Sequence, residues 1–175
     1  MRNIEITVLW WMFWIIVAGF FVAAADTILG YWDFEDYPRG RAFSEGDGIA
    51  TWGTEQADSG THSLGVAGIG QYGEAWSIDY IGAGLSPGDR ICLDLYAKVL
   101  NPTDGATAKV TIYSKARKAL AQGESSKTTG STNWTKLTAC TDWPAGGYAT
   151  KMTGTLYGQG NAWFDSFTLY QKATP

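Results

Sequence analysis

Hydrophobic and polar residues alternate with a period of two along much of the chain. The clearest run is 90–99, in which Ile91, Leu93, Leu95 and Ala97 alternate with residues that are mostly more polar. This period is typical of a β-strand that buries one of its two faces. Glycine, proline, asparagine and aspartate separate such runs at short intervals, as they do in β-sandwiches.

The pattern therefore predicts an all-β domain made of short strands. Pro87 and Gly88 come directly before the clearest strand and are typical turn residues, because proline presets φ and glycine accepts a positive φ. The segment 114–122 carries Lys115, Arg117 and Lys118, and we interpret it as a charged hairpin loop instead of a helix. The predicted strands are 31–36, 48–53, 62–67, 74–80, 90–99, 107–114, 133–140, 150–157 and 162–171.

The chain begins differently, with an apolar segment from Val8 to Ala25 that contains no charged residue. About 18 such residues are enough for a helix that spans a membrane. One interpretation is a cleaved signal peptide, with the small residues 23–25 as the cleavage site. The other is a retained helix, which gives two predicted parts: a long hydrophobic N-terminal α-helix over 1–29 and a β-sandwich over 30–175.

Glu5 lies among the apolar residues at the start of this segment, where a carboxylate needs a positive partner. The segment resembles the N-terminus of a type IV pilin or an archaeal pilin-like subunit. That resemblance implies a carboxylate paired with the N-terminal amine of a neighbouring copy. Arg2, three residues earlier in the helix, is the alternative partner. Trp10, Trp11 and Trp14 would pack against other copies, because indole rings bury a large area.

Composition narrows the classes of partner. The net charge is −4 and basic residues form no cluster, which argues against binding to nucleic acid. The only two cysteines, Cys92 and Cys140, lack the spacing of a metal or redox motif. We expect them to form a disulfide if the domain is extracellular, and two buried free thiols are the alternative.

Several short motifs follow one another in the order found in a known family. They are Trp-Asp-Phe-Glu at 32–35, Ser-Gly-Thr-His-Ser-Leu at 59–64, Leu-Ser-Pro-Gly at 85–88, Asn-Trp-Thr-Lys-Leu-Thr at 133–138 and Trp-Phe-Asp-Ser-Phe-Thr-Leu at 163–169. Together they resemble a carbohydrate-binding module with a jelly-roll β-sandwich of the galactose-binding-like type. The resemblance covers 31–171 and bears on the fold more than on the function, since such sandwiches serve many roles.

The resemblance also implies two kinds of site. Members of the family often hold a structural Ca²⁺ ion, for which carboxylates and carbonyl groups supply oxygen ligands. The residues at matching positions are Asp33, Glu35, Ser59, His62 and Asp165. Sugar rings stack on exposed aromatic residues in this family, and the candidates here are Trp76 first, then Tyr72, Tyr96, Tyr113 and Tyr157.

No residues indicate catalysis. Glycosidases need two carboxylates at a fixed separation, one of them with a raised pKa, and the acidic residues of the polar loops show no sign of burial. The first hypothesis is a non-catalytic subunit of an extracellular filament on the cell surface. It would pass through the membrane before it assembles with copies of itself. The second is a secreted carbohydrate-binding module that binds a polysaccharide, and a third is a membrane-tethered receptor domain.

Overall fold

The computed structural model describes residues 24–36 and 43–173, and this part of the chain is all-β. The predicted N-terminal helix falls largely on residues 1–23, so Glu5, Trp10, Trp11 and Trp14 lie outside the described residues. Among the residues described, no helix has the length and hydrophobicity needed to span a membrane. The strands are β1 (Thr27–Trp32), β2 (Phe43–Gly53), β3 (Ser63–Ile81), β4 (Arg90–Leu100), β5 (Gly105–Tyr113), β6 (Ala119–Glu124), β7 (Thr132–Asp142), β8 (Ala149–Tyr157) and β9 (Gly160–Gln171).

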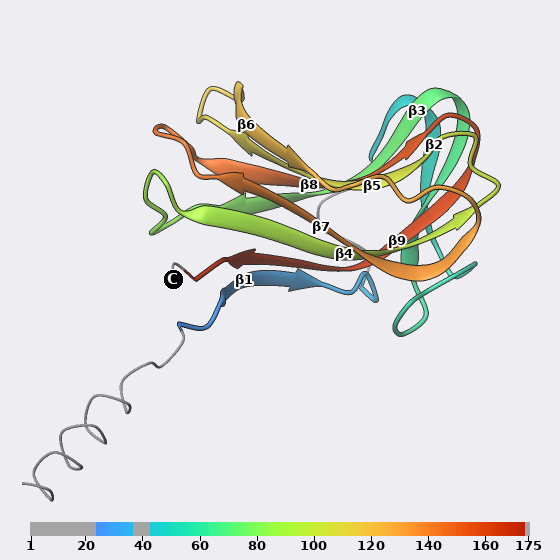
Figure 1. Ribbon diagram of the computed structural model, residues 1–175, viewed down its shortest axis with the longest axis horizontal. Coiled ribbons are helices and arrows are strands. Elements are labelled where there is room, and N and C mark those ends of the chain that lie inside the picture. The colour runs from blue at the N-terminus through green and yellow to red at the C-terminus, as the bar shows by residue number, and fades with distance from the viewer. Residues whose placement is uncertain (1–23, 37–42, 174–175) are drawn as a thin grey trace, which may run out of the picture.

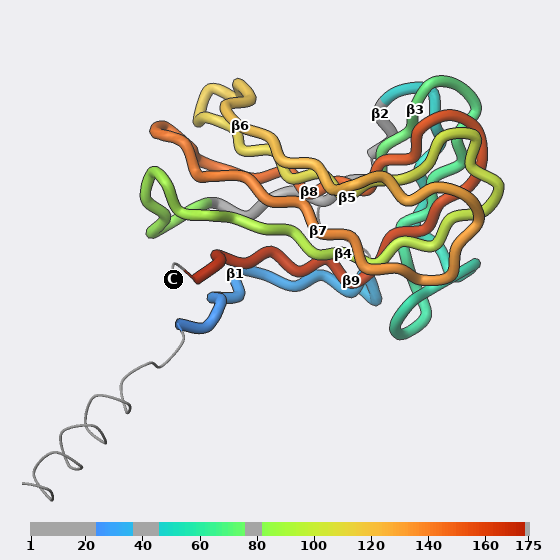
Figure 2. The backbone as a smooth tube through the Cα atoms, viewed as in Figure 1, coloured from blue at the N-terminus to red at the C-terminus, as the bar shows by residue number. Residues whose placement is uncertain are grey.

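The strands form a β-sandwich whose two layers share β3 (Figure 1). The hydrogen-bonded order is β6-β5-β8-β3-β9-β4-β7, with β1 added to β9 and β2 added to β3. Residues 72–81 of β3 pair with β8 in one layer, whereas residues 64–68 pair with β9 in the other. In Figure 2, β1 runs beside β9, its antiparallel partner.

The core lies between the two layers and follows the predicted alternation. In β4 the side chains of Ile91, Leu93, Leu95 and Ala97 are fully buried. From the facing layer, β5 and β8 contribute core side chains that include Val110, Ile112, Met152 and Leu156. Burial of these aliphatic side chains is the main force that holds the layers together.

The two cysteines are joined. Cys92 on β4 lies directly opposite Cys140 on β7, and a disulfide links them across 48 positions of sequence. Of the two alternatives left open by the sequence, the structure has the disulfide.

The prediction of separate strands at 62–67 and 74–80 is wrong, because both belong to β3. The glycines between them indicated a turn, but here they allow two backbones to approach closely. A Cβ atom on Gly48 of β2 would lie 2.6 Å from the Cα of Gly73 on β3. Neither position has room for a side chain, and it is in this region that β3 passes from one layer to the other.

The ends of two other predictions also differ. Part of 114–122 forms β6, an edge strand whose residues are mostly exposed, and only residues 114–118 form the expected turn. The first strand ends at Trp32 instead of residue 36 and begins at Thr27, within the predicted helix of 1–29. It ends early because Phe34 has a φ of 60°, and its buried ring packs edge-on against Phe167 at 5.0 Å.

Candidate functional site

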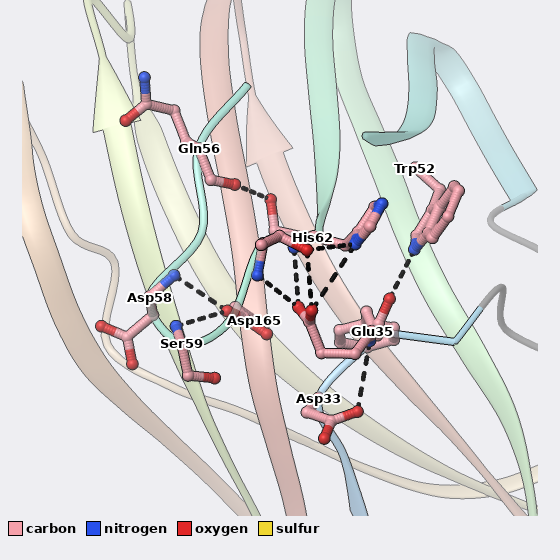
Figure 3. A network of polar contacts seen from close by, with 11 residues as sticks. Asp33, Glu35, Trp52, Gln56, Asp58, Ser59, His62 and Asp165 are labelled. Carbon is pink, nitrogen blue, oxygen red and sulfur yellow. Dashed lines mark hydrogen bonds and ion pairs between the residues drawn. The ribbon is translucent and has the colours of Figure 1, made fainter. Parts of the chain in front are cut away.

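The loop between β2 and β3 is held against β9 by one buried carboxylate. Asp165 accepts hydrogen bonds from the backbone N–H groups of Asp58 (2.9 Å) and Ser59 (3.0 Å) (Figure 3). Its other oxygen accepts the N–H of Ser166 at 2.6 Å. Burial raises the pKa of Asp165, although these N–H groups oppose the shift. The loop thus depends on an acidic side chain within the sheet.

A second carboxylate holds the end of the same loop. Glu35 accepts the backbone N–H groups of His62 and Thr61, both at 2.8 Å, and the hydroxyl of Thr61 at 2.9 Å. These bonds favour the ionised form and lower the pKa of Glu35 to about 2. The ring of His62 in turn stacks on Trp52, with ring centroids 4.1 Å apart and planes 5° from parallel.

Four of the five residues predicted to hold calcium take part in these contacts. The fifth, Asp33, lies in the turn after β1, where its carboxylate accepts the N–H of Glu35 at 3.3 Å. Across residues 24–36 and 43–173, no three histidine, cysteine, aspartate or glutamate side chains lie close enough to hold a metal ion. Calcium needs 6 to 8 oxygen ligands, whereas N–H donors point at both Glu35 and Asp165. This arrangement does not fit a calcium ion, and the calcium site stays a prediction.

A different set of polar residues lines the layer β6-β5-β8-β3 on the side away from the core. We call it the polar face. Alternation places it there, because its members on β5 and β8 lie between residues whose side chains point into the core. Its residues are Tyr72, Glu74, Thr107, Lys109, Glu124, Lys151, Thr155 and Tyr157.

Glu74 lies at the centre of the polar face and is only 7% exposed. Its carboxylate contacts the ammonium groups of Lys109 at 2.8 Å and Lys151 at 3.2 Å. Burial alone would raise the pKa of Glu74, but the bonds and charges of the two lysines hold it below its ordinary value. The three charges are therefore fixed in place beside one another, which suits them to orient a ligand.

The aromatic ring of Tyr157 lies at the edge of this charged group. Its hydroxyl donates to Glu124 at 2.6 Å, and Lys127 lies 4.5 Å from its ring centroid. Lys127 also pairs with Asp104 at 2.7 Å. Burial and the bond to Glu124 raise the pKa of Tyr157. The ring is thus held in one orientation by contacts at both its hydroxyl and its π-system.

The structure brings some of the predicted aromatic residues together and separates others. Tyr72 lies directly opposite Tyr157 in the pairing of β3 with β8, and Tyr113 lies on β5 in the same layer. Trp76 is paired with Thr153 in the backbone, but its side chain lies outside the described residues. Tyr96 lies in the other layer, opposite Lys136.

The charged members of the polar face were not predicted from the sequence. Glu74, Lys109, Lys151 and Glu124 come from four strands, and no motif of local spacing joins them. The available signal was alternation: Lys109 and Lys151 occupy the outward positions of strands whose inward positions are buried.

The fold is similar to that of known carbohydrate-binding modules. The xylan-binding domain CBM22-1 of Paenibacillus barcinonensis Xyn10C covers 87% of this chain and is covered over 99% of its own length, with a TM-score of 0.58 and 15% identity. A xylan-binding domain from CBM 22 gives a TM-score of 0.63 and 16% identity over 85% of this chain and 97% of its own.

A third similar structure contains a ligand. It comprises the CBM22-1 and GH10 modules of Clostridium thermocellum xylanase 10B in complex with xylohexaose. Its TM-score is 0.65 and its identity 18%, over 85% of this chain and 29% of that longer one. No protein-family model matches the sequence, and no curated protein does. At these identities the likeness shows the fold alone, which is a β-sandwich.

Proposed function

We propose that this protein is an extracellular, non-catalytic carbohydrate-binding domain that holds a polysaccharide on its polar face. The observation that carries the proposal is the combination found there: aromatic rings at the edge of a fixed array of hydrogen-bonding side chains. Sugars are recognised by such a combination, because a ring stacks on the apolar faces of the sugar while polar groups bind its hydroxyls.

The charges of the polar face favour an uncharged polysaccharide. Glu74 is paired with Lys109 and Lys151, and Lys127 is paired with Asp104. Glu124 accepts the hydroxyls of Tyr157 and Thr107. The two ammonium groups of the polar face balance its two carboxylates, and the nearby Lys127–Asp104 pair is neutral, so the face offers no excess charge to an ionised sugar. Proteins of similar fold that are described as xylan-binding make xylan the first polysaccharide to test.

The filament hypothesis receives no support from the comparisons. It rests on Glu5, Trp10, Trp11 and Trp14, which lie outside the described residues. Assembly with copies of the chain and passage through a membrane therefore stay predictions from the sequence, and the polysaccharide hypothesis is the better supported of the two.

The proposal is tested by affinity electrophoresis of the full chain in gels that contain soluble xylan, with a detergent that has no sugar headgroup. Tyr72→Ala removes a ring that is 36% exposed on the polar face. We expect it to weaken retardation about tenfold, because loss of one stacked ring costs about 1.4 kcal/mol of binding free energy.

The matched control is Tyr31→Ala, which removes another exposed tyrosine, on β1 of the other layer. It should leave retardation unchanged. Equal retardation of Tyr72→Ala and the unmodified chain, or no retardation by xylan or by soluble cellulose derivatives, would contradict the proposal.

A further inference from the structure

A hollow lies in the other layer, away from the polar face. Its volume is about 110 Å³ and its lining comprises Thr51, Trp52, Gly53, Glu55, Ser63, Gly65 and Trp163. Backbone pairing aligns Thr51 of β2 with Gly65 of β3, and Gly65 with Trp163 of β9. The neighbours of Gly65 in sequence, Leu64 and Val66, are buried in the core. The hollow therefore opens on the outward side of this layer. We call it the Trp163 hollow.

The hollow exists because its central position is a glycine. A Cβ atom on Gly65 would lie 3.0 Å from the hydroxyl oxygen of Thr51 and 3.5 Å from Cδ1 of Trp163. A larger side chain at this position would fill the space between these two residues. Trp163 is half-buried, so part of its indole ring faces the hollow and part is packed.

One end of the hollow is held rigid by the loop that follows β2. The hydroxyl of Ser63 donates to the backbone carbonyl of Gln56, and Lys98 donates to the side-chain carbonyl of Gln56 at 2.6 Å. Glu55, the preceding residue, is exposed and lines the hollow. Its carboxylate is thus attached to a segment that two hydrogen bonds fix in place.

The chemistry of the lining matches a single sugar ring. An indole ring offers a surface for the C–H groups of a pyranose, while Thr51 and Glu55 offer oxygen atoms to its hydroxyls. The carboxylate of Glu55 disfavours an acidic sugar, because like charges repel. From this geometry we infer that the Trp163 hollow is a second binding site, for one neutral pyranose ring of a glycan.

This inference shares its ligand class with the proposed function but none of its residues. The two can therefore be tested in one experiment. The full chain, labelled with ¹⁵N in a detergent that has no sugar headgroup, is titrated with xylohexaose and separately with cellohexaose. We expect the signals of the Trp163 indole and of the Thr51 and Gly65 amides to shift with at least one of these sugars. An oligogalacturonate should leave them unchanged.

Two substitutions sharpen the result. Trp163→Ala should abolish the shifts at Thr51 and Gly65, whereas Trp163→Phe, which keeps a ring and guards against misfolding, should retain weaker ones. The matched control is Trp134→Ala, because Trp134 is also a half-buried indole but lies on β7 outside the hollow. It should leave the titration unchanged.

The possible outcomes distinguish the two proposals. Shifts at Tyr72 and Tyr157 without any at Trp163, Thr51 or Gly65 would overturn the second site and support the polar face. Shifts confined to the Trp163 hollow would support the second site and contradict the role of the polar face. Shifts at Thr51 and Gly65 that persist in Trp163→Ala would also overturn the inference.

Discussion

The carboxylate of Glu74 on β3 lies 2.8 Å from the ammonium group of Lys109 on β5, across the intervening strand β8. Both side chains are nearly buried, with 9% and 13% exposed. Loss of one partner from such a pair leaves a buried charge uncompensated. We therefore expect Glu74→Gln to lower the free energy of unfolding by about 3 kcal/mol, measured by urea denaturation at neutral pH.

An exposed ion pair between two loops, one before β5 and one after β6, serves as the control. Asp104 and Lys127 lie 2.7 Å apart, but 55% and 37% of their side chains are exposed. Asp104→Asn should cost less than about 1 kcal/mol, because solvent screens such a pair. Equal effects of the two substitutions would contradict the view that burial makes the Glu74 pair the larger contributor to stability.

The hydrogen bonds to Glu35 predict how stability changes in acid. Its pKa is lowered from 4.5 to about 2, so the folded state binds this proton less readily than the unfolded state does. The contribution of Glu35 is fully present above pH 4.5 and is lost as the pH falls through about 2. The stability difference between the unmodified chain and Glu35→Gln should therefore shrink across this range. A difference that stays constant with pH would refute the assignment.

Asp165 should behave in the opposite sense. Burial raises its pKa above the ordinary value of 3.8, so its ionisation opposes folding as the pH rises above that value. Asp165→Asn should therefore remove a pH dependence of opposite sign to that of Glu35, measured in the same denaturation series. Because the two pH dependences have opposite signs and would partly cancel, each residue is tested by its own single substitution.

Calcium removal tests the metal site that the sequence predicted. Backbone N–H groups already compensate the charges of Glu35 and Asp165. We expect the melting temperature to be the same in EDTA as in millimolar CaCl₂. Glu35→Gln provides the comparison, since a bound ion would make its effect depend on calcium. A rise of several degrees with calcium, lost in Glu35→Gln, would establish the calcium site instead.

Gly60 is predicted to be the least replaceable residue of this loop. Its φ is +62°, and a Cβ atom there would lie 2.3 to 2.7 Å from the carboxyl atoms of Glu35. Gly130 has a similar φ of +73° but open space around it. Gly130→Ala should cost about 1 kcal/mol from backbone strain alone. Gly60→Ala should cost clearly more in thermal or chemical denaturation, and equal costs would show that the approach to Glu35 is unimportant.

Local patterns predicted the strands well where one face is apolar and continuous. The strand at 90–99 coincides with β4, because its alternating aliphatic residues are all buried. β6 was missed because it is short and mostly exposed, so no buried face marks it, and the charged residues before it favoured a hairpin loop that extends to residue 122. The continuity of β3 was missed for a related reason. Its glycines are required by a close approach to β2, which no local pattern reveals.

The candidate sites show the same limit more strongly. Family resemblance identified Glu35 and Asp165 as neighbours of the β2–β3 loop, but not that N–H groups would satisfy both. The charged group around Glu74 could be predicted only with the order of β3, β8 and β5 known. The Trp163 hollow likewise required the alignment of Thr51, Gly65 and Trp163. Such contacts depend on strand register, which a single sequence does not specify.

The pairing of the first strand with the last has a mechanical consequence. Because β1 and β9 are antiparallel and Thr27 lies opposite Gln171, the two ends of the described chain leave the sandwich at the same end of these strands. Tension applied between these ends would peel the strands apart one hydrogen bond at a time, and little force would be needed. A load carried by the N-terminal end and by a glycan on a distant surface would instead pull along β1. All the hydrogen bonds between β1 and β9 would then be loaded at once. The domain should therefore resist a larger force between its N-terminal end and a bound glycan than between its two chain ends.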